Sequence, residues 1–477
     1  MSTNRRKRVL FISYLFPPVG GVGVQRVTKF VKYLPEFGWD SSVLTVSNPS
    51  VPLHDESYHK DIPANTIIRR AKTYEPGYAV KQAVASNGSG KQSGGLMSWA
   101  KGMVKRVGNF VLQPDAQILW HFHAWREALK LLKEVPHDLI VATGPPFSSL
   151  VLGGKLARKT CLPLILDYRD EWSISNAYWE NKQQGSIANW IQKRQQFQAV
   201  RAADVLLATT PSSAQSVAEV ALAAGSSARS TYIYNGFDSD DFPTAGGRIE
   251  KVDYGNGTDR FRLAFIGTLW NLNSIEPVVT AIERLSNYHP HLAGKLELLL
   301  AGRRMPEQEA IVDRLEQTEC KVTRLPFVQH AEAVQLMQSA DALLMLNSDV
   351  PHAHRIINAK TFEYMAARRP MFVVAPEGDV WDIVRDLPGT MLCPPSDVER
   401  IKDNLALIIE QFRCDVHFDD AHWDIDKFHR RQIAGQLATL LNTTIGQPAG
   451  ETWPTSTHDA ANIEPSTEDT NESAGEK

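Results

Sequence analysis

Residues 8–39 read RVLFISYLFPPVGGVGVQRVTKFVKYLPEFGW, and this stretch predicts the fold. A continuous apolar run leads through two prolines and a glycine cluster into a segment with helical spacing, from about Val24 to Phe37. A buried strand, a glycine turn and a helix in this order are typical of a parallel α/β sheet. The turn also exposes backbone N–H groups at the start of a helix, which suits an anion or sugar hydroxyls.

The same alternation continues along the chain and predicts two parallel sheets, each covered by helices on both faces. Apolar runs that read as strands of a first sheet lie at residues 41–46, 138–144, 162–170 and 203–210. A second series follows at 261–269, 295–302, 321–328, 340–347 and 369–376. Between the two series, residues 243–260 are rich in Gly, Pro and charge, as a linker would be.

Composition excludes several classes of protein. The 477 residues carry a formal net charge of −3, whereas a general nucleic-acid binder usually has a strong basic excess. The four cysteines, at 161, 320, 393 and 414, form no Cys-x-x-Cys pair, which indicates free thiols in a reducing compartment. No run of about 20 apolar residues predicts a membrane-spanning helix. We therefore expect a cytoplasmic protein of two domains, after a basic extension at residues 1–8.

Two segments depart from the α/β pattern. A loop and an amphipathic helix are expected over residues 85–112, where apolar side chains recur at helical spacing and lysines and arginines lie mostly off that stripe. Such a helix can lie in a membrane interface, through residues 95–112, or pack on the domain core with its basic face in water. Residues 443–477 are polar and acidic, with few large apolar groups, which predicts a disordered tail.

The glycine cluster does not match the two common phosphate loops. A Walker loop ends in Gly-Lys-Ser/Thr, which is missing here. A dinucleotide fingerprint has a third glycine where this chain has Arg26, and an acidic residue after the second strand, which here ends in TVSNPS. The remaining interpretations are an anion-binding turn that includes Arg26, or a turn whose glycines are only structural.

Polar residues at the predicted strand ends are candidates for chemistry, because ligands bind there in doubly wound sheets. Asp167, Arg169 and Asp170 end one strand of the first sheet and are either catalytic groups or an interdomain ion-pair network. Candidate acceptor-side residues are Asp115, Trp120, Thr143 and Ser148. The nearby pair His121 and His123 could bind a metal, but the sequence offers no third ligand, so no metal site is predicted.

The second half has its own cluster. Gly267 and Thr268 end its first strand, and a later helix carries polar groups at and before its start, namely His354, Arg355, Asn358, Lys360 and Glu363. A carboxylate suits ribose hydroxyls, and Lys or Arg suits a diphosphate. The alternative is an amphipathic surface helix without a ligand.

In combination, these motifs resemble the retaining nucleotide-sugar glycosyltransferases of the GT-B fold, close to family four (glycosyl transferases group 1), over roughly residues 8–442. The motifs that carry the resemblance are FPPVGGVGVQR, ATGPPFSSLVLG, LPLILDYRDEWS, NGFDSDDF, FIGTL, AKTFEYMAARRP and APEGD. The resemblance implies two Rossmann-like domains that face each other across a cleft. It places the acceptor mainly in residues 9–242, the donor mainly in 261–426, and a crossover helix at 427–442, with no cofactor and no obligatory metal.

The resemblance also implies roles for single residues. Gly20, Gly21 and Gly23 would lie near the donor phosphates and the acceptor, with Gly267 on the donor side. Glu363 would bind the donor ribose, as the second glutamate of a Glu, seven residues, Glu motif whose first place holds Arg355. Asp167 or Asp170 would orient or deprotonate the acceptor hydroxyl, and no nucleophile is assigned.

One departure from the family concerns the diphosphate. Many relatives carry an Arg and then a Lys after the first strand of the second domain, where this chain has Thr268 and Asn273. Positive charge would have to come from elsewhere, and the sequence offers four candidates: Arg26, Arg303, Arg355 and Lys360.

The sequence therefore predicts a hexosyltransferase-type enzyme that moves a sugar with retention from a nucleotide-sugar donor to a glycan or lipid-linked acceptor. We expect it to act in the biosynthesis of cell-surface polysaccharides or glycoconjugates, on the inner face of the cell membrane. Its partners would be donor, acceptor and membrane surface, with no nucleic acid. Two alternatives stay open, a nucleotide-sugar epimerase and a degenerate GT-B scaffold that only binds a glycan or a partner protein.

Overall fold

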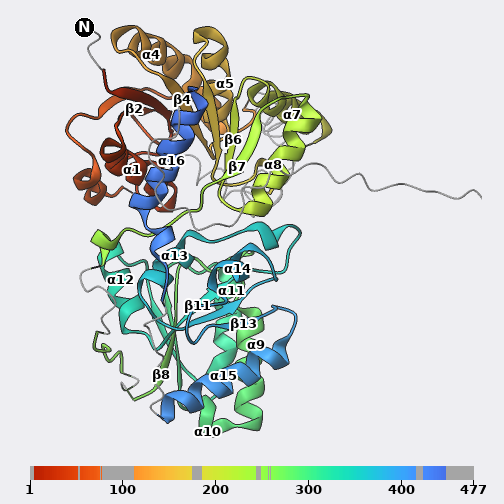
Figure 1. Cartoon of the computed structure of the whole chain (residues 1–477). Coiled ribbons are helices and arrows are strands. Elements are labelled where there is room, and N and C mark those ends of the chain that lie inside the picture. Colours follow the sequence, from red (N-terminus) through yellow and green to blue (C-terminus); the bar gives the residue numbers. More distant parts are fainter. Residues whose placement is uncertain are drawn as a thin grey trace, which may run out of the picture.

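In the computed structural model the chain forms two α/β domains, one above the other in Figure 1. The structure describes residues 5–51, 54–75, 77, 112–174, 185–242, 249–255, 257, 259–414 and 423–446. The amphipathic helix expected within 85–112 lies outside these residues, except for Leu112. So do residues 243–248, 256 and 258 of the expected linker, and nearly all of the expected tail, from residue 447 onward.

The first domain is built on a seven-stranded parallel sheet with the order β3-β2-β1-β4-β5-β6-β7. Its strands are β1 (Lys7–Ile12), β2 (Trp39–Val46), β3 (Ile67–Ala71), β4 (Leu139–Gly144), β5 (Leu164–Tyr168), β6 (Val205–Ala208) and β7 (Arg229–Tyr232). One face is covered by α4 (His121–Glu134), α5 (Ser148–Thr160), α7 (Ser186–Val200) and α8 (Pro211–Ala224). The other face is covered by α1 (Val22–Tyr33) and α16 (Arg430–Thr444). The strand order reverses between β1 and β4, the place where such sheets bind ligands.

The helix expected from Val24 to Phe37 differs in detail. α1 starts at Val22 and ends at Tyr33, and Leu34–Phe37 form a separate 3-10 turn, η1. The reason is Pro35, which has no N–H to donate to the preceding turn of an α-helix. Gly38 then reverses the chain at φ 82°, and β2 starts at Trp39.

The second domain is a six-stranded parallel sheet with the order β10-β9-β8-β11-β12-β13. Its strands are β8 (Phe261–Ile266), β9 (Leu296–Ala301), β10 (Lys321–Leu325), β11 (Ala342–Leu346), β12 (Met371–Val374) and β13 (Met391–Cys393). One face packs on α12 (His330–Ser339), α13 (Ala359–Ala366) and α14 (Asp379–Val384), and the other on α9 (Glu276–Tyr288), α10 (Pro290–Ala293), α11 (Pro306–Asp313) and α15 (Val398–Arg413). The predicted architecture of two Rossmann-like domains with parallel sheets is confirmed.

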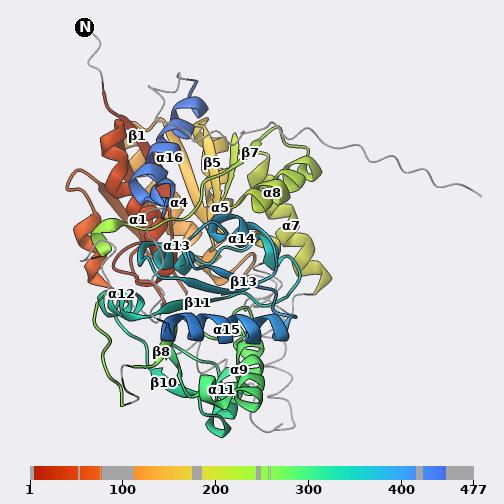
Figure 2. The ribbon, with the colours of Figure 1, turned by 60° about the horizontal axis from the view of Figure 1, so that its bottom comes forward.

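The chain crosses between the domains twice, and the two crossings are bonded to each other. The first follows β7, and the second runs from Trp423 into α16, which packs beside α1 in both views (Figures 1 and 2). Phe237 N donates to Phe428 O at 3.1 Å, and Arg430 N donates to Phe237 O at 2.8 Å. Gly236 permits this approach, because a Cβ there would lie 2.0 Å from the carbonyl oxygen of Phe428. The remaining short helices are η2 (Glu56–Asp61), η3 (Ala116–Trp120), η4 (Ser239–Asp241), η5 (Arg314–Gln317), η6 (Ala353–Arg355) and η7 (Asp426–Phe428).

Candidate donor site between the two domains

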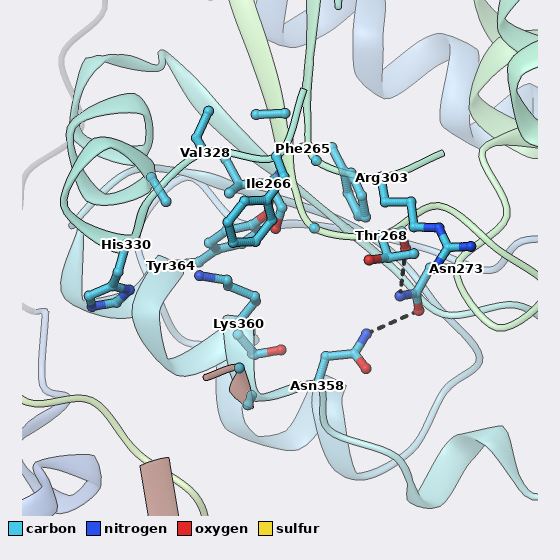
Figure 3. Close-up of a pocket in the computed structure, with 18 of the residues that line it drawn as sticks. Phe265, Ile266, Thr268, Asn273, Arg303, Val328, His330, Asn358, Lys360 and Tyr364 are labelled. Carbon is cyan, nitrogen blue, oxygen red and sulfur yellow. Dashed lines mark hydrogen bonds between the residues drawn. The ribbon is translucent and has the colours of Figure 1, made fainter. Parts of the chain in front are cut away.

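A pocket of about 420 Å³ lies where the two domains meet. The second domain contributes most of its wall, from the carboxyl ends of β8, β9 and β11 and from the first turns of α12 and α13 (Figure 3). The first domain contributes Gly21 and Gln25 at the start of α1, and Asp55 and Tyr58 at the start of η2. Both sheets therefore turn their ligand-binding edges toward one cavity.

Two glycine turns shape the end of the pocket formed by β8 and β9. Gly302 has φ +128°, and a Cβ on it would lie 2.1 Å from the carbonyl oxygen of Gly267. The two loops continue side by side, since Gly267 N donates to Ala301 O and Leu269 N donates to Arg303 O, both at 2.9 Å. Thr268 and Arg303 are therefore neighbours on the pocket wall, although 35 residues separate them in the sequence.

The start of α13 provides the polar end of the pocket. Asn358, immediately before the helix, donates from Nδ2 to Leu346 O at 3.1 Å and to Asn347 Oδ1 at 2.8 Å, which ties the helix to the end of β11. Lys360, in the first turn, lines the pocket and forms an ion pair with Glu363 one turn later.

Glu363 connects this helix to the first domain. Its side chain is buried, and Gln25 Nε2 of α1 donates to its Oε1 at 3.3 Å. Burial alone would raise the pKa of Glu363, but Lys360, His330 and the hydrogen bonds from Lys360 and Gln25 outweigh it and lower the pKa. Glu363 is therefore a carboxylate held ionised beside the pocket, next to the lining residue Lys360, and able to accept hydrogen bonds.

Sequence reasoning missed the two pocket residues between β2 and β3. Tyr58 OH accepts a hydrogen bond from Gln25 Nε2 at 3.2 Å, and Asp55 Oδ1 caps η2 by accepting from Ser57 N at 2.9 Å. The capping pattern, Asp followed by Ser two residues later, was a readable signal for a helix start. That this turn reaches the second domain depends on the tertiary structure and leaves no local signal.

An apolar wall faces these polar groups. It is formed by Phe265 and Ile266 of β8, Phe327 and Val328 after β10, and Met345 of β11. A pocket with an apolar wall and a few polar groups at one end is typical of sites for small organic ligands.

Arg26 and Asp167, both candidate functional residues, bind each other. Arg26 Nε lies 3.2 Å from Asp167 Oδ1, and both side chains are 2% exposed. Thr143 Oγ1 donates to Asp167 Oδ2 at 2.8 Å, and Arg26 also donates to Tyr234 O at 3.0 Å. The cluster ties α1, β4 and β5 to the segment that leaves the first domain, and none of these side chains lines the pocket.

Arg169 supports the glycine turn. It donates to the backbone oxygens of Gly23 and Pro145, so the turn after β1 is held against the turn after β4. Gly21 lines the pocket at φ 95°, whereas Gly20, in the turn, and Gly23, in the first turn of α1, do not line the pocket. Asp170 is exposed and lies outside the lining.

The acceptor-side candidates lie in the first domain and do not line the pocket, and Thr143 belongs to the cluster of Arg26 and Asp167. Asp115 Oδ2 accepts from Ser148 N at 3.0 Å, and burial raises the pKa of Asp115 to about 6. His121 Nε2 donates to Ser148 O at 2.6 Å, and burial lowers its pKa to about 4. Trp120 is fully buried in the core and donates from Nε1 to Ala71 O at 3.2 Å.

Arg355 lies at an interdomain contact and does not line the pocket. Its Nη1 is 3.3 Å from Glu171 Oε2 of the first domain.

Of the predicted donor-binding residues, the structure thus brings five to the pocket, and these are Gly21, Gly267, Thr268, Arg303 and Lys360. Glu363 adjoins them through Lys360.

Within the described ranges, no group of three or more His, Cys, Asp or Glu side chains is arranged to hold a metal ion. Searched over the same residues, no helix is long and apolar enough to cross a membrane.

Comparison with known proteins identifies the class. Residues 260–411 match the family of Glycosyl transferases group 1, a range that runs from the start of β8 into α15 and contains the second-domain wall of the pocket. No curated protein matches the chain by sequence. The second domain is thus similar to the glycosyl transferases group 1 family, and the predicted resemblance of the chain to GT-B glycosyltransferases is confirmed.

Solved structures agree with this fold over 92–94% of the chain. The catalytic domain of starch synthase IV from Arabidopsis thaliana, bound to ADP and acarbose, is 12% identical at a TM-score of 0.58, over 93% of this chain and 100% of that one. Sucrose-phosphate synthase from Thermosynechococcus elongatus is 14% identical at a TM-score of 0.57, over 92% of this chain and 100% of that one. A chain from Listeria monocytogenes, provisionally named a UDP-N-acetylglucosamine 2-epimerase, is 10% identical at a TM-score of 0.52. The similarity covers 94% of this chain and 100% of that one. At these identities the likeness establishes the fold, which transferases share with an epimerase-type chain.

Proposed function

We propose that this protein is a glycosyltransferase that moves a sugar from a nucleotide-sugar donor to a glycan or lipid-linked acceptor with retention. The observation that carries the proposal is the pocket at the carboxyl ends of the second sheet, inside the range that matches the family. It combines an apolar wall, which suits a nucleobase, with the cation of Lys360, and the ionised Glu363 lies directly beside Lys360. ADP in the similar starch synthase structure supports a nucleotide as the ligand.

In this proposal the chain's own residues bind and orient the donor. Glu363 accepts hydrogen bonds from ribose hydroxyls, and its contact with Gln25 makes the donor site complete only when the domains are together. The acceptor oxygen bonds to the anomeric carbon on the face from which the diphosphate departs. The bond to the phosphate oxygen breaks with its electron pair, and the acceptor proton passes to that departing oxygen. Positive charge fixed at the pocket stabilises the departing group more than the bound donor, which lowers the barrier.

A thermal-shift screen of the full chain against nucleotide sugars is the first test. A ligand that binds only the folded state raises the midpoint of unfolding, so one donor class is expected to raise it at low concentration. Nuclear magnetic resonance of a donor-only incubation then separates the transferase from the epimerase, because an epimerase converts or releases the sugar without an acceptor. Calorimetry that finds no binding of UDP, ADP or GDP would favour a scaffold without transferase activity.

We further propose that the acceptor belongs to cell-surface polysaccharide or glycoconjugate synthesis and that residues 95–112 bring the enzyme to the inner face of the membrane. The sequence pattern of aromatic, methionine and basic residues in that segment supports the proposal. Co-sedimentation with vesicles containing anionic lipid is expected to fall when the segment is deleted. Equal sedimentation of both proteins would refute the membrane role and leave the transferase proposal standing.

A further inference from the structure

Arg303 is a cation of the pocket whose charge no acidic side chain compensates among the described residues. Its backbone is fixed by the hydrogen bond from Leu269 N, while its guanidinium is exposed and takes part in no ion pair within the described part of the chain. Figure 3 draws its side chain beside Thr268 and Asn273, at the opposite end of the pocket from His330.

Each of the other three candidate cations has an acidic partner. Arg26 is buried against Asp167, and Arg355 pairs with Glu171 outside the pocket. Lys360 lines the pocket, but Glu363 neutralises it in a close ion pair. A ligand with two negative groups therefore finds one uncompensated guanidinium at this wall, that of Arg303.

The turns after β8 and β9 explain why Arg303, which follows β9, lies beside the end of β8. Gly302 lies so close to Gly267 that no side chain fits between them, and the two loops then run side by side. Leu269 and Arg304 form an isolated parallel bridge, so Arg303 adjoins Thr268. The side chain of Arg303, from the loop after β9, thus reaches the part of the pocket wall that the loop after β8 forms.

We propose that Arg303 binds the diphosphate of the donor and replaces the positive charge that Thr268 and Asn273 do not supply. The inference rests on the proposed function, since it assigns a residue to the same site. A guanidinium is suited to this role because its planar fork donates two parallel hydrogen bonds to phosphate oxygens. The nucleoside itself would bind elsewhere in the pocket, at the apolar wall and Glu363.

Calorimetry with the full chain tests this with three probes, the nucleoside, the nucleoside monophosphate and the nucleoside diphosphate of whichever base binds. Arg303→Ala is expected to weaken diphosphate binding by roughly 10- to 100-fold and to leave nucleoside binding unchanged. Arg284→Ala is the matched control, because Arg284 lies on α9 in a surface ion pair with Glu399. It is expected to bind all three probes as the parent does.

A relocation variant separates the charge from the particular residue. Because Thr268 is exposed and adjoins Arg303, the double variant Arg303→Ala with Thr268→Arg places a guanidinium on the same wall. It is expected to recover most of the lost diphosphate affinity.

Three outcomes would overturn the assignment. They are unchanged diphosphate binding by Arg303→Ala, equal weakening of the nucleoside and the diphosphate, and a double variant as weak as the single one. A parent protein that binds no nucleoside diphosphate would instead overturn the proposed function, so the two failures are distinguishable.

Discussion

At the scale of single residues, Glu363 is the side chain that joins the pocket, α13 and the first domain. Glu363→Gln keeps the shape and removes the charge, so hydrogen bonds from the donor's hydroxyls become neutral and weaker. Because hydrogen bonds to a charged group contribute about 1.5–3 kcal/mol, KM for the nucleotide sugar is expected to rise roughly 10- to 100-fold. The control is Glu399→Gln, an exposed glutamate of α15. An unchanged KM for Glu363→Gln would rule out the ribose-binding role.

His121 gives a prediction about pH and stability. Its pKa falls from 6.5 to about 4 on folding because burial disfavours the imidazolium. The unfolded chain therefore binds the proton of this ring more tightly than the folded chain does. The folded state keeps its full stability above pH 6.5, and it loses stability as the pH falls toward 4. The loss of unfolding free energy is expected to stay below about 3 kcal/mol, because the ring is not fully buried.

The measurement is urea unfolding of the parent and of His121→Gln between pH 4 and 7. Glutamine can still donate to Ser148 O but does not titrate, so the variant's stability is expected to change less over this range. His291→Gln, at an exposed position, is the control and should keep the parent's slope. Parallel curves for parent and His121→Gln would contradict the assignment of the slope to this ring.

The residue scale also shows what the sequence could predict. Lys360 and Glu363 lie three residues apart on one helix, so local spacing alone places them together. Arg26 and Asp167 are 141 residues apart, and their pairing depends on the order of β1, β4 and β5 in the sheet. Both look like free functional groups at element ends until the fold shows that each satisfies the other.

At the scale of elements, the turn at Gly302 is the most demanding piece of backbone near the pocket. Gly302→Ala combines a positive φ with a Cβ 2.1 Å from Gly267 O, so it is expected to cost about 2–4 kcal/mol in unfolding free energy. Gly225→Ala is the control, because it has φ +65° but no atom within 4 Å of a new Cβ, and its expected cost is about 1 kcal/mol. Equal costs in denaturant unfolding would show that the contact with Gly267 relaxes freely.

Strand prediction succeeded where both faces of the sheet are covered, and at the sheet edges it found β10, at residues 321–328, but missed β3, β7 and β13. β1, β4, β5, β8, β9 and β11 are continuous apolar runs, because helices pack on both of their sides. β3 and β7 are edge strands with mostly half-buried or exposed residues, and the sequence analysis did not single them out. An edge strand needs less apolar surface, so composition carries less of its signal.

At the scale of the whole molecule, the position of the two domains depends on contacts that no local pattern specifies. On the side of the interdomain segment, Lys29 and Lys32 of α1 pair with Asp238 and hold its pKa well below its usual range, although burial alone would raise it. Elsewhere between the domains, Thr210 Oγ1 donates to Arg355 O at 3.0 Å. These residues lie far apart in the chain, which is why the sequence predicted two domains but not their contacts.

Asp379 is the contact best suited to a test of domain closure. Its carboxylate, at the start of α14, accepts from Ser212 N at 3.2 Å and from Ser212 Oγ at 2.7 Å, at the N-terminus of α8 in the other domain. A carboxylate at a helix N-terminus is stabilised by the unpaired N–H groups and the helix dipole. Asp379→Ala removes an interaction of about 1–3 kcal/mol that exists only when the domains are together.

Asp379→Ala is therefore expected to populate an opened molecule, with a larger radius of gyration in small-angle X-ray scattering. Its donor KM should also rise several-fold, because Gln25 then contacts Glu363 less often. Asp382→Ala is the matched control, since Asp382 lies on the same helix but pairs with Arg385 at the surface. If the scattering curves of both variants superimpose on that of the parent, then the other interdomain contacts, including those of Lys29 and Lys32 with Asp238, suffice to hold the domains together. In that case Asp379 stabilises α8 without controlling closure.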